Sequence, residues 1–275
     1  MRNSFVCLSA LLISLSPADP LGGQYSQDFS EEITDTSLFG GNNYAPYRND
    51  GYLVMTQDGR QGENYWKLPL LDAQTPISEF EVEFDLQISG SRGLSDGFSI
   101  TFGNIPDGLA GRGELGFRQP HSLIIGWDTY ANGGEGTSVE IFSNISSIAN
   151  HPHNFQTTKD TWTPVVITWK NNMLNVSYNG TLIAENLPTD GFEPKAGDTF
   201  AFAAAAGGDS QSTYIDNVSI RTGPSSVDPP SPPFRKIIDE QFDDSELEDF
   251  EITRQNISVS GGFLKSSGRG IILTK

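Results

Sequence analysis

Residues 79–89 read EFEVEFDLQIS and alternate strictly between apolar and polar side chains. The apolar set is Phe80, Val82, Phe84, Leu86 and Ile88, and acidic or amide side chains fill the positions between them. Successive side chains of a β-strand point to opposite faces. The stretch therefore predicts a strand with one face in a hydrophobic core and a row of solvated carboxylates on the other.

Strand signals of the same kind continue on the C-terminal side, with turn residues between them. The Asn179-Gly180 pair suits a two-residue hairpin turn whose central residues need positive φ. There is no sustained period near 3.6, and the chain holds 29 glycines and 16 prolines. These features predict an all-β protein, an antiparallel two-sheet jelly-roll sandwich. The expected strands lie within residues 79–89, 96–104, 121–130, 137–144, 164–185, 198–208 and 212–222.

The first twenty residues, MRNSFVCLSALLISLSPADP, have the pattern of a secretory signal peptide. Arg2 precedes an apolar run, and small residues at Ser16 and Ala18 fit cleavage after Ala18, so residues 1–18 are the expected signal peptide. The apolar run is too short for a membrane span. Cys7 is the only cysteine. We therefore expect a secreted, extracellular mature chain with no disulfide and no membrane span.

Composition divides the rest into a large domain and a tail. The sandwich is expected over residues 24–222, followed by a Pro/Ser-rich linker at 223–234, GPSSVDPPSPPF, which favours extended geometry. Residues 235–275 weakly repeat the start of the sandwich and are too few for another one. They are interpreted as the start of a second, truncated β module, or alternatively as edge strands added to the first domain.

The charge balance limits the class of partner. The chain has 17 Lys+Arg against 35 Asp+Glu, a formal net charge of -18. Binding nucleic acid or an anionic membrane needs clustered cations, so no nucleic-acid partner is expected. A calcium ion or a neutral polar ligand such as a glycan suits this surface better.

Three segments occur in a fixed order: SDGFSITFG (95–103), GRGELGF (111–117) and LIIGWDTYAN (123–132). Together with DTFAFAAAAGGDSQSTYIDNVSI (198–220), this order resembles the L-type (legume-lectin-like) lectin family of concanavalin A-like sandwiches. The resemblance covers roughly residues 25–222. It implies a secreted module that binds carbohydrate without catalysing a reaction.

The resemblance also implies a role for individual residues. Asp96 would accept hydrogen bonds from two sugar hydroxyls, Gly113 would donate a backbone N–H, and Asn132 would donate its amide to the same sugar. Calcium would be held by the Asp128 carboxylate, the Tyr130 main-chain oxygen and the Asn132 carbonyl. Tyr130 or Trp127 are the candidates for an apolar surface under the C–H face of the sugar.

The chain departs from the family pattern at the metal positions. Members with a second, transition-metal site place a glutamate two residues before the metal aspartate, where this chain has Gly126. The histidine that completes that site is missing from TSVEIF (137–142). A later aspartate shared by both metals has no match, and Glu135 is the available substitute. We therefore expect no transition-metal site, and calcium whose coordination shell is completed by water.

Other interpretations of these residues remain open. Asp96, Asp128 and Asn132 are also ordinary turn residues, in which case the chain is a structural or adhesion sandwich that has lost the sugar site. A glycoside hydrolase needs two paired carboxylates, but the row Glu81, Glu83 and Asp85 ends in a glutamine and is better explained as a solvated face. His151 and His153 in HPHNF suggest a metal pair, although a surface loop is the preferred interpretation. Sequons occur at Asn144, Asn175, Asn179, Asn217 and Asn256.

Overall fold

The computed structural model describes two compact units, Met1–Ser225 and Ser226–Lys275. In the first unit the described residues are 23–31, 35–42, 45–69, 71, 75–105, 113, 115, 120–208 and 211–223, and in the second only the backbone of four short strands is described. The expected signal peptide (1–18) and nearly all of the linker (223–234) lie outside the described residues.

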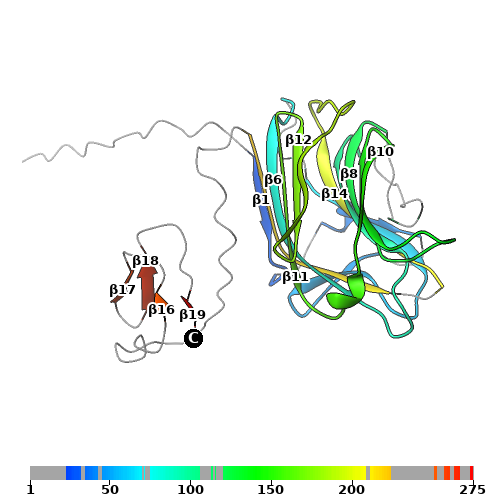
Figure 1. Cartoon of the computed structure of the whole chain (residues 1–275), viewed down its shortest axis with the longest axis horizontal. Coiled ribbons are helices and arrows are strands. Elements are labelled where there is room, and N and C mark those ends of the chain that lie inside the picture. The colour runs from blue at the N-terminus through cyan, green and yellow to red at the C-terminus, as the bar shows by residue number, and fades with distance from the viewer. Residues whose placement is uncertain are drawn as a thin grey trace, which may run out of the picture. The chain divides into compact units, whose positions relative to one another are not determined.

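The first unit is a sandwich of two antiparallel sheets, which face each other in Figure 1. The eight-stranded sheet has the order β13-β12-β11-β6-β15-β4-β3, and β1 pairs with β15 beside β4. Its strands are β1 (Gln24–Gln27), β3 (Tyr47–Asn49), β4 (Tyr52–Thr56), β6 (Glu79–Ser89), β11 (Thr163–Lys170), β12 (Met173–Tyr178), β13 (Thr181–Pro188) and β15 (Ser212–Thr222).

The seven-stranded sheet has the order β10-β9-β8-β7-β14-β5-β2. Its strands are β2 (Phe39–Gly41), β5 (Gly62–Lys67), β7 (Gly97–Gly103), β8 (Ser122–Asp128), β9 (Ser138–Ser143), β10 (Ser146–Pro152) and β14 (Thr199–Ala206). The predicted all-β, two-sheet jelly-roll class is confirmed. Strands close in the sheet are often far apart in the chain, as with β7 and β14.

The helical content of the described residues is two 3-10 turns, η1 (Thr36–Leu38) and η2 (Phe155–Thr157). Within this part of the chain, neither is long or apolar enough to cross a membrane. Asn154 caps η2 by accepting the Gln156 N–H with its side-chain oxygen, which compensates one of the unpaired donors at a helix start.

Two tight hairpins join β11, β12 and β13. Asn171-Asn172 and Asn179-Gly180 all have positive φ, between 50° and 71°. That is the backbone required by a primed two-residue turn, whose twist matches that of the strands. The turn expected at Asn179-Gly180 is therefore present, and the Asn-Asn pair makes a second one.

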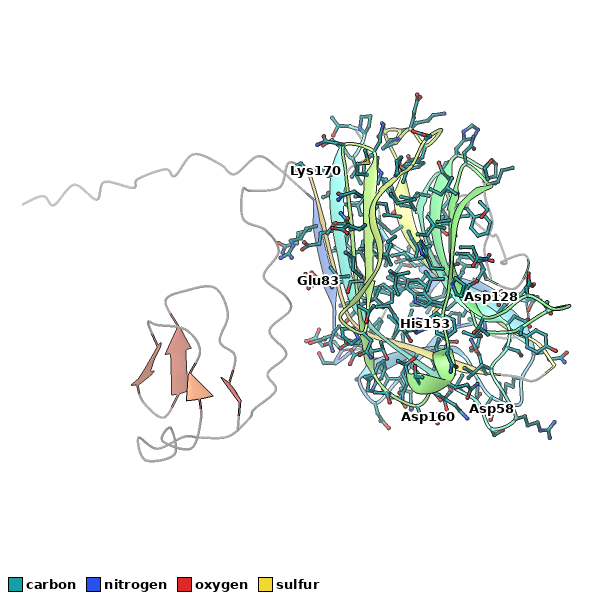
Figure 2. The ribbon with its side chains drawn as sticks, in the orientation of Figure 1. Asp58, Glu83, Asp128, His153, Asp160 and Lys170 are labelled. Carbon is teal, nitrogen blue, oxygen red and sulfur yellow. The ribbon has the colours of Figure 1, made fainter. Side chains whose placement is uncertain are left out.

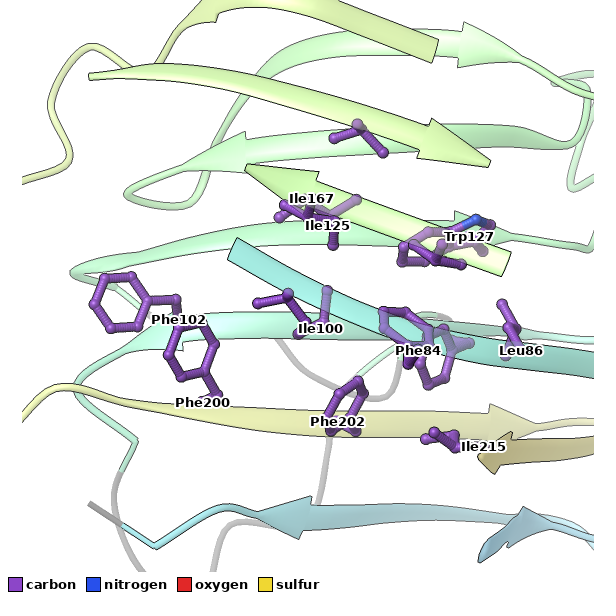
Figure 3. Packing of buried hydrophobic residues seen from close by; sticks show 14 of the residues in the cluster. Phe84, Leu86, Ile100, Phe102, Ile125, Trp127, Ile167, Phe200, Phe202 and Ile215 are labelled. Atoms are coloured by element: carbon purple, nitrogen blue, oxygen red, sulfur yellow. The ribbon is translucent and has the colours of Figure 1, made fainter. Parts of the chain in front are cut away.

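The core lies between the sheets and consists largely of aromatic rings. Phe84 from the eight-stranded sheet contacts Phe202 from the seven-stranded sheet, with ring centroids 5.2 Å apart. Phe102 and Phe200 stack at 4.6 Å within the seven-stranded sheet. Figure 3 shows these rings between the two layers of strands, with Trp127 among them. Burial of this apolar surface is the main stabilising contribution to the fold.

The acidic face of β6 differs from the solvated surface that the sequence predicts. Glu83 and Asp85 are each only 8% exposed. Arg221 on β15 binds both Glu81 and Glu83, and the Asn217 amide donates to Asp85 at 2.9 Å. Glu83 lies on the outer side of the eight-stranded sheet (Figure 2). The prediction that these carboxylates point away from the core is therefore right, and the prediction that water solvates them is wrong. Long polar side chains of the neighbouring strand cover and pair the carboxylates.

In the second unit, β16 (Glu251–Ile252) pairs with β19 (Leu273–Thr274), and β17 (Ile257–Ser260) pairs with β18 (Phe263–Ser266). Both pairs are antiparallel. That residues 235–275 begin a further β module stays a prediction.

Candidate functional site

Asp96 lies where β7 begins, and a cis peptide bond joins it to Ser95. Its N–H donates to the Ala205 carbonyl on β14 at 3.0 Å. Its own carbonyl accepts from the Thr129 N–H at 3.0 Å. Two backbone hydrogen bonds thus fix the Asp96 backbone between β14 and the loop that follows β8.

The Asp96 carboxylate lies directly against the backbone of Gly207. A Cβ added to Gly207 would stand 2.6 Å from Oδ1 and 2.8 Å from Oδ2 of Asp96. The carboxylate is half-buried, and burial raises its pKa. It has no side-chain hydrogen bond or ion pair to any described residue. A half-buried carboxylate on a fixed backbone is suited to accept hydrogen bonds from a ligand.

A buried polar relay runs from Asp96 into the sandwich. The Thr129 hydroxyl donates to Gln211 Oε1 at 2.8 Å, and Gln211 Nε2 donates to the Thr213 hydroxyl at 3.2 Å. Thr213 in turn bonds Thr56 on β4 at 3.0 Å. Sequence analysis missed Gln211. The available signal was Thr213, a polar residue at an inward position of an alternating strand, because a buried hydroxyl needs a partner.

The loop after β8 is closed by its own hydrogen bonds. Asp128 is 3% exposed, and its Oδ1 accepts the Tyr130 N–H at 3.0 Å. The Asn132 carbonyl accepts the Glu135 N–H at 2.8 Å. Gly133 and Gly134 between them have φ of +49° and +105°, a conformation that favours glycine. Asp128 therefore caps the turn at 128–130. Glu135 is exposed at the end of the next turn, 132–135.

The predicted residues lie at one end of the seven-stranded sheet. The pairing of β7 with β8 places Gly97 opposite Asp128. Thr129 is hydrogen-bonded to Asp96, and Asn132 follows three residues later, at most about 11 Å along an extended chain. Figure 2 labels Asp128 at the end of β8. Asp96 and the loop with Asn132 thus belong to the same edge of the molecule.

Gly113 stands two residues before Leu115, which is bonded to the seven-stranded sheet. The Leu115 carbonyl accepts from the Ser99 hydroxyl on β7 at 2.7 Å. Gly113 is exposed, with φ of +89°, and a Cβ added to it would have no other atom within 4 Å. The glycine therefore leaves its backbone open to a ligand, and a substituted residue would be strained.

Of the two aromatic candidates for a sugar surface, Trp127 is buried and Tyr130 is partly exposed. Trp127 is 0% exposed and packs in the core against Phe84 and Phe98. The strand alternation explains this, because Trp127 shares its face with Ile125 and Leu123. Tyr130 is half-buried at the start of the loop.

The surface loop that the sequence predicts for the two histidines is wrong for His151, while His153 lies in the short connection between β10 and η2 with its ring packed against the core. His151 belongs to β10, and the His153 ring packs against Phe155 and Tyr178 at centroid distances of 4.8 and 5.1 Å. The Nε2 atoms of both are buried and have no hydrogen-bond partner in the described part of the chain. Burial lowers the pKa of His153. Across the described ranges no group of three His, Cys, Asp or Glu side chains is arranged to hold a metal.

Among comparisons with known proteins, only the comparison with solved structures gives matches. No family model matches the sequence, and no curated protein matches it. Lectin I-B4 from Griffonia simplicifolia, in a metal-free form, superposes with a TM-score of 0.59 at 13% identity and covers 73% of this chain and 99% of its own. A Bauhinia forficata lectin in complex with GalNAc gives 0.56 at 16% identity, covering 74% and 98%.

The exoplasmic/lumenal domain of VIP36, in a form bound to Ca2+ and Man3GlcNAc, superposes with a TM-score of 0.52 at 16% identity. The match covers 70% of this chain and 87% of that one. At these identities the likeness is one of fold. The chain has the L-type-lectin-like, concanavalin A-like sandwich that its ordered motifs predict.

Proposed function

We propose that this chain is a secreted, non-catalytic carbohydrate-binding module of the lectin kind. Asp96 accepts hydrogen bonds from sugar hydroxyls, the Gly113 N–H donates to the sugar, and the Asn132 amide donates beside them. Tyr130 provides the apolar surface. The observation that carries the proposal is the Asp96 carboxylate, half-buried on a backbone fixed by two backbone hydrogen bonds and without a described side-chain partner.

The electrostatics of this edge favour a neutral ligand with several donors. A carboxylate accepts but does not donate when it is ionised, and sugar hydroxyls supply donors in a fixed arrangement. Hydrogen bonds to a charged acceptor are the stronger kind, about 1.5–3 kcal/mol each. The net charge of -18 disfavours anionic ligands.

Calcium fits the loop after β8 in the kind of donor it prefers. Asp128, Tyr130 and Asn132 offer carboxylate, main-chain and amide oxygens within five residues, and Ca2+ takes 6–8 such ligands. Glu135 follows at the end of the turn, and water would complete the shell. When bound there, the ion would hold the loop that presents the Asn132 amide. The Asp128–Tyr130 hydrogen bond and the turn at 132–135 also form without the ion.

Because the hydrogen bonds of this loop form without an ion, they favour an alternative function. If the turn serves only to join β8 to β9, the chain is a structural or adhesion module that keeps the sandwich and binds no sugar. No comparable observation favours a hydrolase, because Glu81 and Glu83 share Arg221 and Asp85 accepts from Asn217.

A glycan array with wild-type protein and Asp96→Asn, each with and without chelator, tests the proposal. We expect wild type to bind a defined set of glycans and Asp96→Asn to lose them, since the amide replaces one acceptor oxygen by a donor. Chelator-sensitive binding would place calcium in the site. If wild type binds no glycan in either condition, the proposal fails and the structural or adhesion module is the remaining function.

A further inference from the structure

Leu115, which belongs to the glycine-rich stretch of sequence 111–117, is attached to the seven-stranded sheet. A Cβ added to Gly126 on β8 would stand 2.9 Å from Leu115 Cδ2 and 3.1 Å from Cγ, and nearer still to Cδ1. The leucine side chain therefore rests on the bare backbone of Gly126. Any larger residue at 126 would displace it, because heavy atoms do not approach this closely.

A second attachment fixes the backbone of the same residue. The hydroxyl of Ser99, itself 0% exposed, donates to the Leu115 carbonyl at 2.7 Å. Ser99 and Gly126 are register partners on β7 and β8. One residue is thus held by its side chain on one strand and by its carbonyl on the adjacent strand, which sets both its position and its orientation.

These attachments lie next to the candidate sugar site. Gly113 is two residues before Leu115, at most about 7 Å along the chain. Ser99 on β7 is three residues after Asp96, which precedes this strand, and Gly126 is three residues before Thr129. The distance from Gly113 to the Asp96 carboxylate is therefore set by where Leu115 sits on the sheet.

We propose that Leu115 is an apolar anchor and that Ser99 and Gly126 are positioning residues for the sugar-binding Gly113. This deepens the proposed function and rests on it. The anchor rests on Gly126, the position at which the family resemblance implies a glutamate ligand in L-type lectins with a transition metal. A transition metal does not fit there, since Gly126 has no side chain and Leu115 fills the space above it.

The test uses the full chain with Gly126→Ala, Leu115→Ala and Ser99→Ala. Ser138→Ala is the matched control for Ser99, because Ser138 is also buried in this sheet and its hydroxyl has no described partner. The first readout is tryptic cleavage of the folded protein at Arg112 and Arg118, which flank the anchor in sequence. The second is affinity for the glycan that wild type binds best, and the third is the melting temperature.

We expect the three anchor variants to be cleaved about tenfold faster and to bind the glycan about tenfold more weakly, the effect of one ordinary hydrogen bond or apolar contact. Ser138→Ala should behave as wild type. Unchanged cleavage in all three variants would overturn the anchor, whatever the glycan result. Faster cleavage with unchanged affinity would show that the anchor does not serve the site.

The two proposals can fail separately. If wild type binds no glycan, the proposed function fails, while the cleavage rates still decide whether Leu115 anchors the segment. If Gly126→Ala lowers the melting temperature strongly, Ser99→Ala decides, since it removes one hydrogen bond without adding volume.

Discussion

Gly207→Ala should weaken sugar binding without unfolding the protein. The new Cβ would stand 2.6 and 2.8 Å from the two carboxylate oxygens of Asp96, whereas ordinary van der Waals contact begins at 3.4 Å. Gly208 is the matched control, because nothing lies within 4 Å of a Cβ there and the same substitution is made one residue away. Neither glycine has a φ in the left-handed region, so alanine strains neither backbone.

The magnitude follows from the displacement. The carboxylate must move by about 0.6–0.8 Å to restore contact distance. A shift of that size takes a hydrogen bond of about 2.8 Å beyond the usual range. Two charge-assisted hydrogen bonds of about 1.5–3 kcal/mol each are at stake. Because the displaced carboxylate can still make weaker or bent bonds, we expect an affinity loss of about 10–100-fold.

Isothermal titration calorimetry with the best array ligand, alongside thermal melting, is the assay. Gly207→Ala should bind weakly and melt within a few degrees of wild type, since alanine also restricts the unfolded chain by about 0.4–1 kcal/mol. Gly208→Ala should bind as wild type. If Gly207→Ala binds normally while Asp96→Asn does not, the carboxylate is not held where the geometry places it. Equal losses in both alanine variants would point to the loop rather than to Asp96.

Three further predictions concern stability. The pKa of Glu83 is raised from 4.5 to about 7, first by burial and then by the Glu81 charge. The contribution of Glu83 to the free energy of unfolding is therefore present below pH 4.5 and lost as pH rises through about 7. Glu83→Gln should make the free energy of unfolding, measured with urea, depend less on pH over that range. Burial lowers the pKa of His153 below 6.5, so wild type should lose stability as pH falls from about 6.5, and a His153→Phe variant should lose less. Gln211→Ala leaves the Thr129 and Thr213 hydroxyls with fewer partners and should cost about 1–3 kcal/mol in urea unfolding; an unchanged midpoint would contradict the relay.

Local patterning in the sequence determined part of the fold, whereas β1 to β5 and β10 were not among the expected strands. The alternation in residues 79–89 requires a strand with one buried face, because the side-chain period of a strand is two residues. Asn179-Gly180 requires a primed turn, because its backbone needs positive φ at both positions. Neither depends on any distant residue, and both are found as predicted.

Contacts between distant segments were decided only by the tertiary structure. Solvation of the β6 carboxylates could not be predicted, since Arg221 and Asn217 lie more than 130 residues away in the chain and cover them. The packing of the His153 ring depends in the same way on Tyr178 from the other sheet.

For the candidate site, the resemblance of the ordered motifs to the L-type lectin family selected Asp96, Gly113, Asp128 and Asn132. The order of residues along the chain does not determine the distances between loops. Those come from Thr129 bonded to Asp96, Gly207 under the Asp96 carboxylate, and Leu115 seated on Gly126. A sequence specifies which way a side chain points along its own strand, but only the register and packing of neighbouring strands determine what it meets.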